Sequence, residues 1–320
     1  MKVQEFSDGI LAETEKVIVG KHDRLKLIMA AVLSDGHVLL NDLPGSGKTT
    51  LVKALSKALG CGYKRIQFVP DLMPADILGA KVFNQKTGDF EYMEGPVRTN
   101  ILLADEINRA IPRTQSALLE AMEEKQISVD GVPSPLPEPF IVLATQNPVE
   151  MESTFPLPAA QLDRFFICIS LGYLDEAGEI DMLMRSENGD RLGSVEVKAS
   201  PELLLEMQKQ AAAVRAGGDI TTYIIRLVQA TRSNADLRLG ASPRASIALL
   251  KGAKAWAAMS GRDYVVPDDV KTLAPYILTH RVVLTGEAAF AGRTEEMIIS
   301  EILRNTPVPP DRAEALLGKN

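Results

Sequence analysis

The chain has 320 residues, a formal net charge of -7 and a pI near 5.2, and 46% of its residues are hydrophobic while 24% are charged. These values indicate a soluble globular protein of one large or two ordinary domains, and the acidic balance argues against a broad nucleic-acid surface. The sequence has no apolar run near the ~20 residues that span a bilayer, and its first residues lack the apolar core of a signal peptide, so we expect a cytoplasmic protein without a membrane span.

In residues 1–172, short apolar runs alternate with helical patterns. Strands are expected at His37–Leu40, Tyr63–Phe68, Ile101–Ala104, Phe140–Thr145 and Phe165–Ile169, and helices at about Arg24–Ser34, Thr49–Leu59 and Pro112–Glu124. Short, continuously apolar strands are typical of a parallel sheet that is buried on both faces. The pattern predicts a doubly wound α/β domain, in which ligands bind at the carboxyl ends of the strands.

Two insertions interrupt this alternation. Residues 80–97 alternate in polarity around a turn at Lys86–Gly88, and residues 126–139 turn at Asp130–Gly131. Both patterns predict β-hairpins. Ordinary surface loops are the alternative, although loops of this size in a compact domain are more often functional.

From about Leu174 the pattern becomes helical. Typical helix starts and stops lie at Ser200–Pro201, Gly217–Gly218, Ser242–Pro243, Gly261 and Pro267–Asp268, and a further helix is expected from about Thr221 to Arg232. We therefore divide the chain into an α/β core at residues 1–172 and an all-α lid domain at residues 173–320, with a linker at about 186–200 that includes Asn188–Gly193.

The most informative segment is LLNDLPGSGKTTLVKAL, residues 39–55, in which a glycine-rich turn joins an apolar strand to a helix. A helix N-terminus offers unpaired N–H groups and a positive dipole end to phosphate, and Gly45 and Gly47 let the backbone approach it closely. Lys48 suits the β/γ-phosphates, and the Thr49 hydroxyl suits Mg²⁺. The segment predicts a phosphate-binding loop, with an ordinary glycine turn as the alternative.

Asp42 stands where the usual GxxxxGK[ST] pattern has its first glycine. The backbone cradle is expected to survive this change, because Gly45 and Gly47 make the closest approach to phosphate. A non-standard backbone conformation is expected at Asp42 itself.

Two carboxylates end the apolar strand ILLADE, residues 101–106. Beside a phosphate loop, Asp105 suits the water shell of Mg²⁺, and Glu106 suits the general base that activates a water. A solvated turn is the ordinary interpretation of such a pair on its own. Together with the loop upstream, the pair predicts a site that hydrolyses a nucleotide.

Three further polar residues have both a catalytic and an ordinary interpretation. Asn147 in ATQNP suits a residue that orients the lytic water or contacts the γ-phosphate, or else it opens the loop before Pro148. Arg164 in LDRFF suits an arginine finger, with an ion pair to Asp163 or a surface position as the alternative. Arg244 lies in the first turn of a predicted helix, where a cation opposes the helix dipole and fits better if an anion is nearby.

The cysteines and histidines show no partners at metal-ligand spacing, and the cysteine usage suggests a reducing compartment. They and the single tryptophan are expected to be structural residues: Cys61, Cys168, His22, His37, His280 and, in the core, Trp256.

The ordered segments PGSGKT, RIQFVPDLMPADILG, GPVRTNILLADEINRAIPRTQSALLEAMEE, ATQNPVEMESTFPLPAAQLDRF and LRLGASPRA resemble the MoxR family of AAA+ ATPases. The resemblance extends from about Ile18 to about Leu284 and includes segments that are not general features of phosphate loops. It implies a Walker A motif at Pro44, Gly45, Ser46, Gly47, Lys48, Thr49 and Thr50, and a Walker B motif at Asp105 and Glu106. It also implies sensor 1 at Asn147, an arginine finger at Arg164, sensor 2 at Arg244, and an adenine-covering segment at Val17–Gly20, with Val19 and Gly20 at the base.

The resemblance further implies ligands and partners. ATP or ADP would bind with Mg²⁺, which Thr49 and Asp105 would hold mostly through water. AAA+ proteins usually form hexameric rings with nucleotide between subunits, so Arg164 would act on the neighbour's ATP, while Arg244 would act either within its subunit or across the interface. Residues 80–97 would be the helix-2 insert and residues 126–139 the hairpin before sensor 1. The family resembles chaperone-like motors that remodel partner proteins, often ones with a von Willebrand factor A domain.

Three other functions fit parts of the pattern. A small-molecule phosphotransferase would share the phosphate loop but has no evident need for two hairpins or for Arg164. An ATP-gated scaffold with little turnover is disfavoured by the intact Asp105–Glu106 pair. The motor subunit of a metal-chelatase-type complex is closer in mechanism and stays open.

Overall fold

Five strands of the computed structural model form one parallel sheet, and residues 1–42, 45–129, 131–147, 154–186 and 191–309 are described. The strand order is β2 (Tyr63–Gln67), β5 (Ile101–Asp105), β8 (Ile141–Gln146), β1 (Val38–Asn41) and β9 (Ile167–Ile169). All five predicted strands are present, and the α/β core is confirmed. Strand β9 begins at Ile167 instead of Phe165, because Phe165 N–H still donates to the Leu162 carbonyl in the turn after α6 (Ala159–Leu162).

Alternate residues of each strand are buried on opposite faces of the sheet. In β5, Ile101 and Leu103 belong to an apolar cluster with helices α1 (Val3–Glu15), α2 (His22–Leu33) and α3 (Lys48–Ala58). Leu102 and Ala104 belong to a second cluster with α5 (Pro112–Glu124). The first cluster continues into the C-terminal helices, so the α/β part and the helical part share one apolar core.

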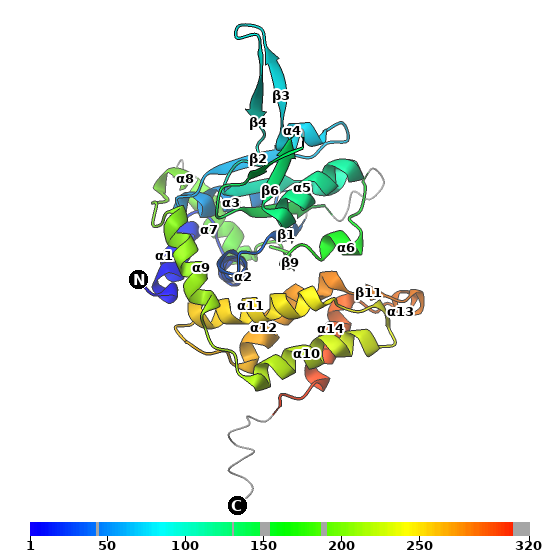
Figure 1. Cartoon of the computed structure of the whole chain (residues 1–320). Coiled ribbons are helices and arrows are strands. Elements are labelled where there is room, and N and C mark those ends of the chain that lie inside the picture. The colour runs from blue at the N-terminus through cyan, green and yellow to red at the C-terminus, as the bar shows by residue number, and fades with distance from the viewer. Residues whose placement is uncertain (43–44, 130, 148–153, 187–190, 310–320) are drawn as a thin grey trace, which may run out of the picture.

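The C-terminal half is helical, as predicted, and lies on one side of the sheet (Figure 1). Its elements are α7 (Glu176–Ser186), α8 (Arg191–Ser194), α9 (Pro201–Ala212), α10 (Gly218–Ser233), α11 (Pro243–Met259), α12 (Pro267–Leu278), α13 (Gly286–Phe290) and α14 (Glu295–Asn305), with the short pair β10 (Leu237–Leu239) and β11 (Val283–Leu284). Ser200 and Ser242 are the N-caps of α9 and α11, and each accepts a backbone N–H. Helix α8 occupies part of the expected linker, and residues 187–190 lie outside the described chain.

Both predicted hairpins are present. Strands β3 (Gly79–Asn84) and β4 (Asp89–Glu94) follow the short helix α4 (Pro74–Leu78) and project far from the sheet (Figure 1). Strands β6 (Gln126–Val129) and β7 (Val132–Pro135) form the second hairpin, although Asp130 of its predicted turn lies outside the described residues. Within the described part of the chain, no helix combines the length and the apolar character needed to cross a membrane.

A buried carboxylate joins α1 to the segment before α9. Glu13 is only 4% exposed, and it accepts hydrogen bonds from Glu196 N at 2.9 Å, Lys16 Nζ at 2.6 Å and Lys198 Nζ at 3.3 Å. The Glu196 N–H and the two ammonium groups lower the pKa of Glu13 to about 2. Glu13 therefore ties the N-terminal helix to the helical part of the chain.

We predict that Glu13→Gln lowers the free energy of unfolding at pH 7 by about 1–2 kcal/mol, because Lys16 and Lys198 each lose an ion pair, although Lys198 keeps its pair with Glu196. The pKa of Glu13 is lower in the folded state, so its stabilisation is complete above the unfolded pKa of about 4.3 and is lost as pH falls toward the folded value. Urea unfolding from pH 7 to pH 3 should show the two proteins converging. Glu206→Gln, on an exposed face of α9, is the control; a gap between wild type and Glu13→Gln that is constant with pH would contradict the prediction.

Candidate functional site

One cavity of about 370 Å³ lies at the carboxyl ends of the parallel strands. The structure brings together there most of the predicted phosphate, metal and general-base residues: Gly45, Ser46, Gly47, Lys48, Thr49, Thr50, Asp105, Glu106 and Asn147. Asp42, Arg65, Gln67, Thr145 and Gln146 complete the lining. Pro44, a predicted Walker A residue, lies outside the described residues.

The phosphate loop has the backbone shape that an anion requires. Gly45 and Gly47 have φ of +83° and +81°, and a Cβ at either position would meet no atom within 4 Å. Both glycines therefore face open space at the N-terminus of α3, whose first turn carries Lys48 and Thr49. A phosphate group fits this cradle, because successive backbone N–H groups and the helix dipole favour a negative charge there.

Lys48 is a partly buried cation directly beside this cradle. Its Nζ donates to the Asp42 carbonyl oxygen at 3.2 Å and to Ser46 Oγ at 3.4 Å. Burial lowers the pKa of the Lys48 ammonium, since desolvation disfavours the charged form. A positive charge at a helix N-terminus is further disfavoured by the helix dipole, so an anion in the loop would relieve both costs.

Asp42 does not have the expected non-standard backbone. The described non-glycine residues with positive φ are Asp35, Glu106 and Lys125. Asp42 N–H instead continues the sheet ladder by donating to the Gln146 carbonyl oxygen at 3.2 Å. The presence of aspartate instead of glycine at this position is explained by its side chain, since the carboxylate is buried and accepts hydrogen bonds.

Neighbouring side chains fix the Asp105 carboxylate. Thr145 Oγ1 donates to Asp105 Oδ1 at 2.6 Å and accepts Glu106 N–H at 2.7 Å. Arg65 reaches the other oxygen, with Nη2 at 2.6 Å and Nε at 3.2 Å from Asp105 Oδ2. The fully buried Thr145 hydroxyl therefore links the two carboxylate residues of the predicted Walker B motif.

Glu106 is held in a left-handed backbone conformation, with φ 55° and ψ 50°. Such a conformation costs about 1–3 kcal/mol in a non-glycine residue and is found preferentially at functional sites. Its Oε2 accepts from Gln67 Nε2 at 2.6 Å and from Arg109 Nη1 at 3.1 Å. Gln67 is in turn held by Arg65, at 2.8 Å. The carboxylate is thus pre-oriented by two donors on the wall of the phosphate cavity.

Asn147 follows β8 and is 6% exposed. Asn108 Nδ2 donates to its carbonyl oxygen at 3.4 Å, which ties the end of β8 to the turn after β5. Asn147 lines the same cavity as Glu106.

A second cavity of about 640 Å³ adjoins the loop, since Gly45, Ser46 and Gly47 line both. Its other walls are the predicted segment Val17–Val19, Lys21, the stretch Gly172–Leu174, and side chains of α7 and α8 such as Met182 and Leu192. Its mostly apolar walls suit a planar base. Gly20 lies beside it with φ +65°, and a Cβ there would stand 3.1 Å from Leu174 Cδ2.

The two predicted phosphate-sensing arginines lie elsewhere. Neither Arg164 nor Arg244 is among the described residues that line the two cavities. Both pair with one carboxylate on α5: Arg164 Nη2 lies 2.9 Å from Glu123 Oε2, and Arg244 Nη2 bonds Glu123 Oε1. With Asp163, they line a separate cavity of about 180 Å³.

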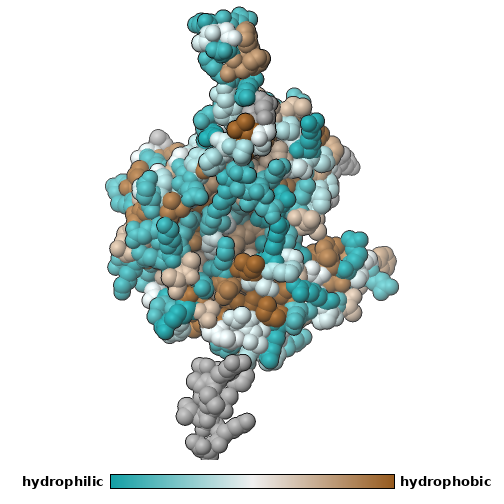
Figure 2. Space-filling view, viewed as in Figure 1, coloured by the Kyte–Doolittle hydropathy of each residue, from teal (hydrophilic) through white to brown (hydrophobic). Residues whose placement is uncertain are grey.

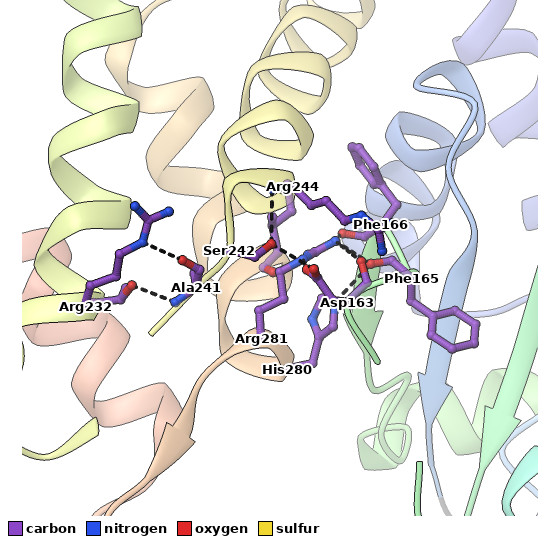
Figure 3. A network of polar contacts seen from close by, with 11 residues as sticks. Asp163, Phe165, Phe166, Arg232, Ala241, Ser242, Arg244, His280 and Arg281 are labelled. Atoms are coloured by element: carbon purple, nitrogen blue, oxygen red, sulfur yellow. Dashed lines mark hydrogen bonds and ion pairs between the residues drawn. The ribbon is translucent and has the colours of Figure 1, made fainter. Parts of the chain in front are cut away.

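A buried network fixes the backbone that carries both arginines (Figure 3). The Asp163 carboxylate accepts from Ser242 Oγ at 2.8 Å, at the start of α11, and from Arg281 Nε at 2.8 Å. Arg281 is 5% exposed and also donates to the carbonyl oxygens of Phe165 at 2.6 Å and Phe166 at 3.1 Å. The turn with Arg164 and the helix start with Arg244 are therefore held as one unit.

The remaining predicted structural residues have structural surroundings. His37 is buried, accepts Val142 N–H at Nδ1 and donates from Nε2 to the Met122 carbonyl oxygen; burial lowers its pKa to about 4. His280 contacts the Phe165 carbonyl, His22 pairs with Glu15 on the surface, and Trp256 is partly buried against the core. Burial raises the pKa of both Cys61 and Cys168 to about 12. Among the described residues, no group of three or more His, Cys, Asp or Glu could hold a metal ion by itself.

Sequence reasoning missed several residues of the site. Arg65 and Gln67 lie in the RIQF segment, which contributed to the family resemblance but received no role. In the sequence, Thr145 is predicted only as the end of a strand and Glu123 only as part of a helix, and Arg281 has no predicted role. Their spacing along the chain contains no signal, because Arg65, Gln67 and Thr145 meet their partners only once the sheet has formed, and Glu123 and Arg281 only once the lid has packed on it.

The parallel sheet, the phosphate loop and the helical lid define an AAA+ ATPase. Residues 37–167 match the ATPase family associated with various cellular activities (AAA), and residues 229–302 match the AAA lid domain. The chain is 39% identical over 310 residues to chaperone MoxR1 of Mycobacterium tuberculosis (strain ATCC 25618 / H37Rv), covering 93% of this chain and 81% of that protein. The chain therefore belongs to the MoxR family of AAA+ ATPases.

Two further relatives are more similar in sequence. The uncharacterized protein YeaC of Bacillus subtilis (strain 168) is 49% identical over 298 residues, which cover 93% of each protein. A crystal structure of an ATPase candidate from Cytophaga hutchinsonii superposes with a TM-score of 0.90 at 40% identity and covers 96% of both chains. The whole described fold, including the lid, is thus a fold that relatives share.

We predict that Arg281→Met lowers the free energy of unfolding by about 3–5 kcal/mol, because it leaves the Asp163 carboxylate without its buried charge partner. Chemical denaturation measures this difference. Arg304→Met, at an exposed position near the end of α14, is the control and should change stability by less than about 0.5 kcal/mol. Equal, small effects of both substitutions would contradict the buried network.

Proposed function

We propose that this chain binds ATP with Mg²⁺ and hydrolyses it, with Glu106 as the general base. The observation that carries the proposal is the shared cavity in which Asp105, Glu106 and Asn147 face the glycines and Lys48 of the phosphate loop. A binding site alone would need the loop but not a pre-oriented pair of carboxylates beside it. This arrangement favours a hydrolysing enzyme over a scaffold with little turnover.

Each residue has a role that its surroundings support. The loop amides and Lys48 bind the β/γ-phosphates, and Thr49 and Asp105 hold Mg²⁺, mostly through water. Bound Mg²⁺ neutralises charge on the phosphates. Glu106 orients the attacking water and takes its proton, and Asn147 positions the same water. Val19 and Gly20 lie on the adenine side of the site.

We further propose that Arg164 and Arg244 act on the nucleotide of a neighbouring subunit in a hexameric ring. Their absence from the walls of their own chain's nucleotide cavities supports a role in trans for both. Their convergence on the two oxygens of Glu123 supports a joint role, because one phosphoryl group presents oxygens at similar spacing. In the proposed division of the chain, Arg164 belongs to the core at residues 1–172 and Arg244 to the lid at residues 173–320.

The projecting hairpin is proposed to contact partner proteins. Its exposed apolar side chains are Val82, Phe83, Phe90 and Met93, and the rings of Phe83 and Phe90 meet edge to face at 5.3 Å. Figure 2 shows apolar surface gathered on this otherwise polar projection. Such a surface suits a chaperone-like motor that acts in the cytoplasm and remodels other proteins, including ones with a von Willebrand factor A domain. The name of the relative, chaperone MoxR1, agrees with this role.

We predict that Glu106→Gln retains ATP binding within about 3-fold but lowers turnover by at least ~100-fold, because the amide cannot take a proton from water. Phosphate release and equilibrium binding of ATP measure the two effects separately. Glu124→Gln, at an exposed position at the end of α5, is the control. Wild-type turnover by Glu106→Gln would refute the assignment of the base.

We predict that Arg164→Ala and Lys48→Ala subunits, each nearly inactive alone, recover ATPase activity when mixed. A mixed ring contains interfaces in which an intact loop faces an intact Arg164, a group worth about 10³-fold or more in related sites. A mixture of Glu106→Gln with Lys48→Ala is the control, because every nucleotide site in it is defective. No recovery in mixed rings that light scattering shows to be assembled would contradict action in trans.

A further inference from the structure

Asp42 connects the phosphate loop to a distant segment through its buried side chain. The carboxylate is 5% exposed and accepts three hydrogen bonds: Oδ1 from Ser170 Oγ at 2.8 Å and Gly172 N at 3.2 Å, and Oδ2 from Leu171 N at 2.5 Å. These donors belong to the stretch after β9, residues 170–174, which we call the connector. A glycine at position 42 would make none of these bonds.

The backbone of Asp42 faces the other parts of the site. Its carbonyl oxygen accepts from Lys48 Nζ at 3.2 Å, and its N–H donates to the Gln146 carbonyl oxygen at 3.2 Å, next to Asn147. One residue is therefore bonded to the phosphate-binding lysine, to the end of the sensor strand and to the connector. A bound phosphate that attracts Lys48 Nζ would therefore change the hydrogen bond between Lys48 and the Asp42 carbonyl oxygen.

The connector forms the opposite end of the nucleotide site. Gly172, Tyr173 and Leu174 line the cavity on the adenine side, and α7 begins directly after them at Glu176. Lys21 Nζ donates to the Tyr173 carbonyl oxygen at 2.7 Å, which ties the connector to the residue that follows the predicted adenine-covering segment. The position of the connector therefore sets both the shape of this cavity and the start of the helices that follow.

We propose that Asp42 is a positioning residue that couples the phosphate end of the site to its adenine end, so that an anion bound at Lys48 orders the connector. The coupling rests on the proposed nucleotide site but is independent of hydrolysis. It gives the departure from the glycine pattern a function: the carboxylate transmits the state of the loop to the segment that leads into the lid.

The chemistry of the three donors makes Asp42→Asn the sharpest variant. Asparagine has the same shape, but one of its two terminal atoms is an NH₂ donor. In either orientation the NH₂ faces at least one backbone N–H, of Leu171 or of Gly172, and that N–H loses its acceptor. Ser170→Ala is the matched control, because it removes one donor but leaves both backbone N–H groups bonded to the carboxylate.

Pyrophosphate is the probe, because it fills the phosphate loop but carries no base that could touch the connector. Amide hydrogen exchange should show saturating pyrophosphate slowing exchange in both residues 45–52 and the connector in wild type and in Ser170→Ala, by at least ~5-fold. In Asp42→Asn and Asp42→Gly, the loop should stay protected while protection of the connector falls below ~2-fold. The Kd of ADP should rise about 10-fold in both Asp42 variants, about 1.4 kcal/mol, without a comparable change in Ser170→Ala.

Each other outcome decides against the proposal or against its basis. Connector protection that persists in both Asp42 variants, or that pyrophosphate does not produce in wild type, overturns the coupling. A lowered Tm with unchanged exchange and unchanged ADP affinity also overturns it, because Asp42 would then be merely structural. Failure of pyrophosphate to protect the loop itself in wild type would instead contradict the nucleotide site.

Discussion

Strand β1 is hydrogen-bonded in parallel to β8 on one side and to β9 on the other, and the geometry of the whole site depends on this double pairing. Its register aligns Asn41 with Gln146 and Leu40 with Ile169, so the chain leaves all three strands at one edge of the sheet. The phosphate loop, the Asn147 segment and the connector begin there side by side. A slip of one residue in either pairing would turn these side chains to the opposite face. The arrangement of the candidate site is therefore a consequence of sheet register more than of any single loop conformation.

The candidate carboxylates Asp105 and Glu106 are fixed much more rigidly than the side chains of Arg164 and Arg244. Asp105 and Glu106 are fixed by short hydrogen bonds from Thr145, Arg65 and Gln67, and such preorganisation avoids rearrangement during a reaction. The Arg164 and Arg244 side chains are 29% and 50% exposed, and exposed ion pairs such as theirs with Glu123 contribute about 0–1 kcal/mol each. Their backbone, by contrast, is anchored by buried Arg281. A firmly held backbone with exposed side-chain ends suits the role proposed for Arg164 and Arg244, in which each would exchange Glu123 for a phosphate group of a neighbouring subunit.

Much of this fold follows from local sequence patterns, and the parts that do not are those set by tertiary contacts. The five strands, the lid helices α9 to α12 and both hairpins have apolar runs or cap residues that predict them, whereas α7, α8, α13 and α14 are not predicted individually. The site at Gly45–Thr49 follows from a glycine-rich turn, and the site at Asp105–Glu106 follows from a strand that ends in two carboxylates. Helix α1 is not among the predicted elements, although Val3, Phe6, Ile10 and Leu11 recur at helical spacing. The convergence of Arg164 and Arg244 on Glu123 has no local signature, since the three residues come from three elements that meet only in the folded chain. The same holds for Asp42: the sequence shows that it replaces the usual glycine, but it does not show that residues 170–172 donate hydrogen bonds to its carboxylate.

The α/β part and the lid share a continuous apolar core. Such a core resists gradual deformation and favours movement of packed elements as units. Two carboxylates of the α/β part bond segments that lead into the lid or belong to it: Asp42 holds the connector before α7, and Asp163 holds Ser242 and Arg281 of the lid. A bound nucleotide can shift the lid only if it binds two arrangements differently, and that difference must act where charged groups face both the loop and the lid. Asp42 meets this condition within one subunit, through the carbonyl that accepts from Lys48. In the proposed ring, the Asp163 network would meet it between subunits, through the arginines that it carries.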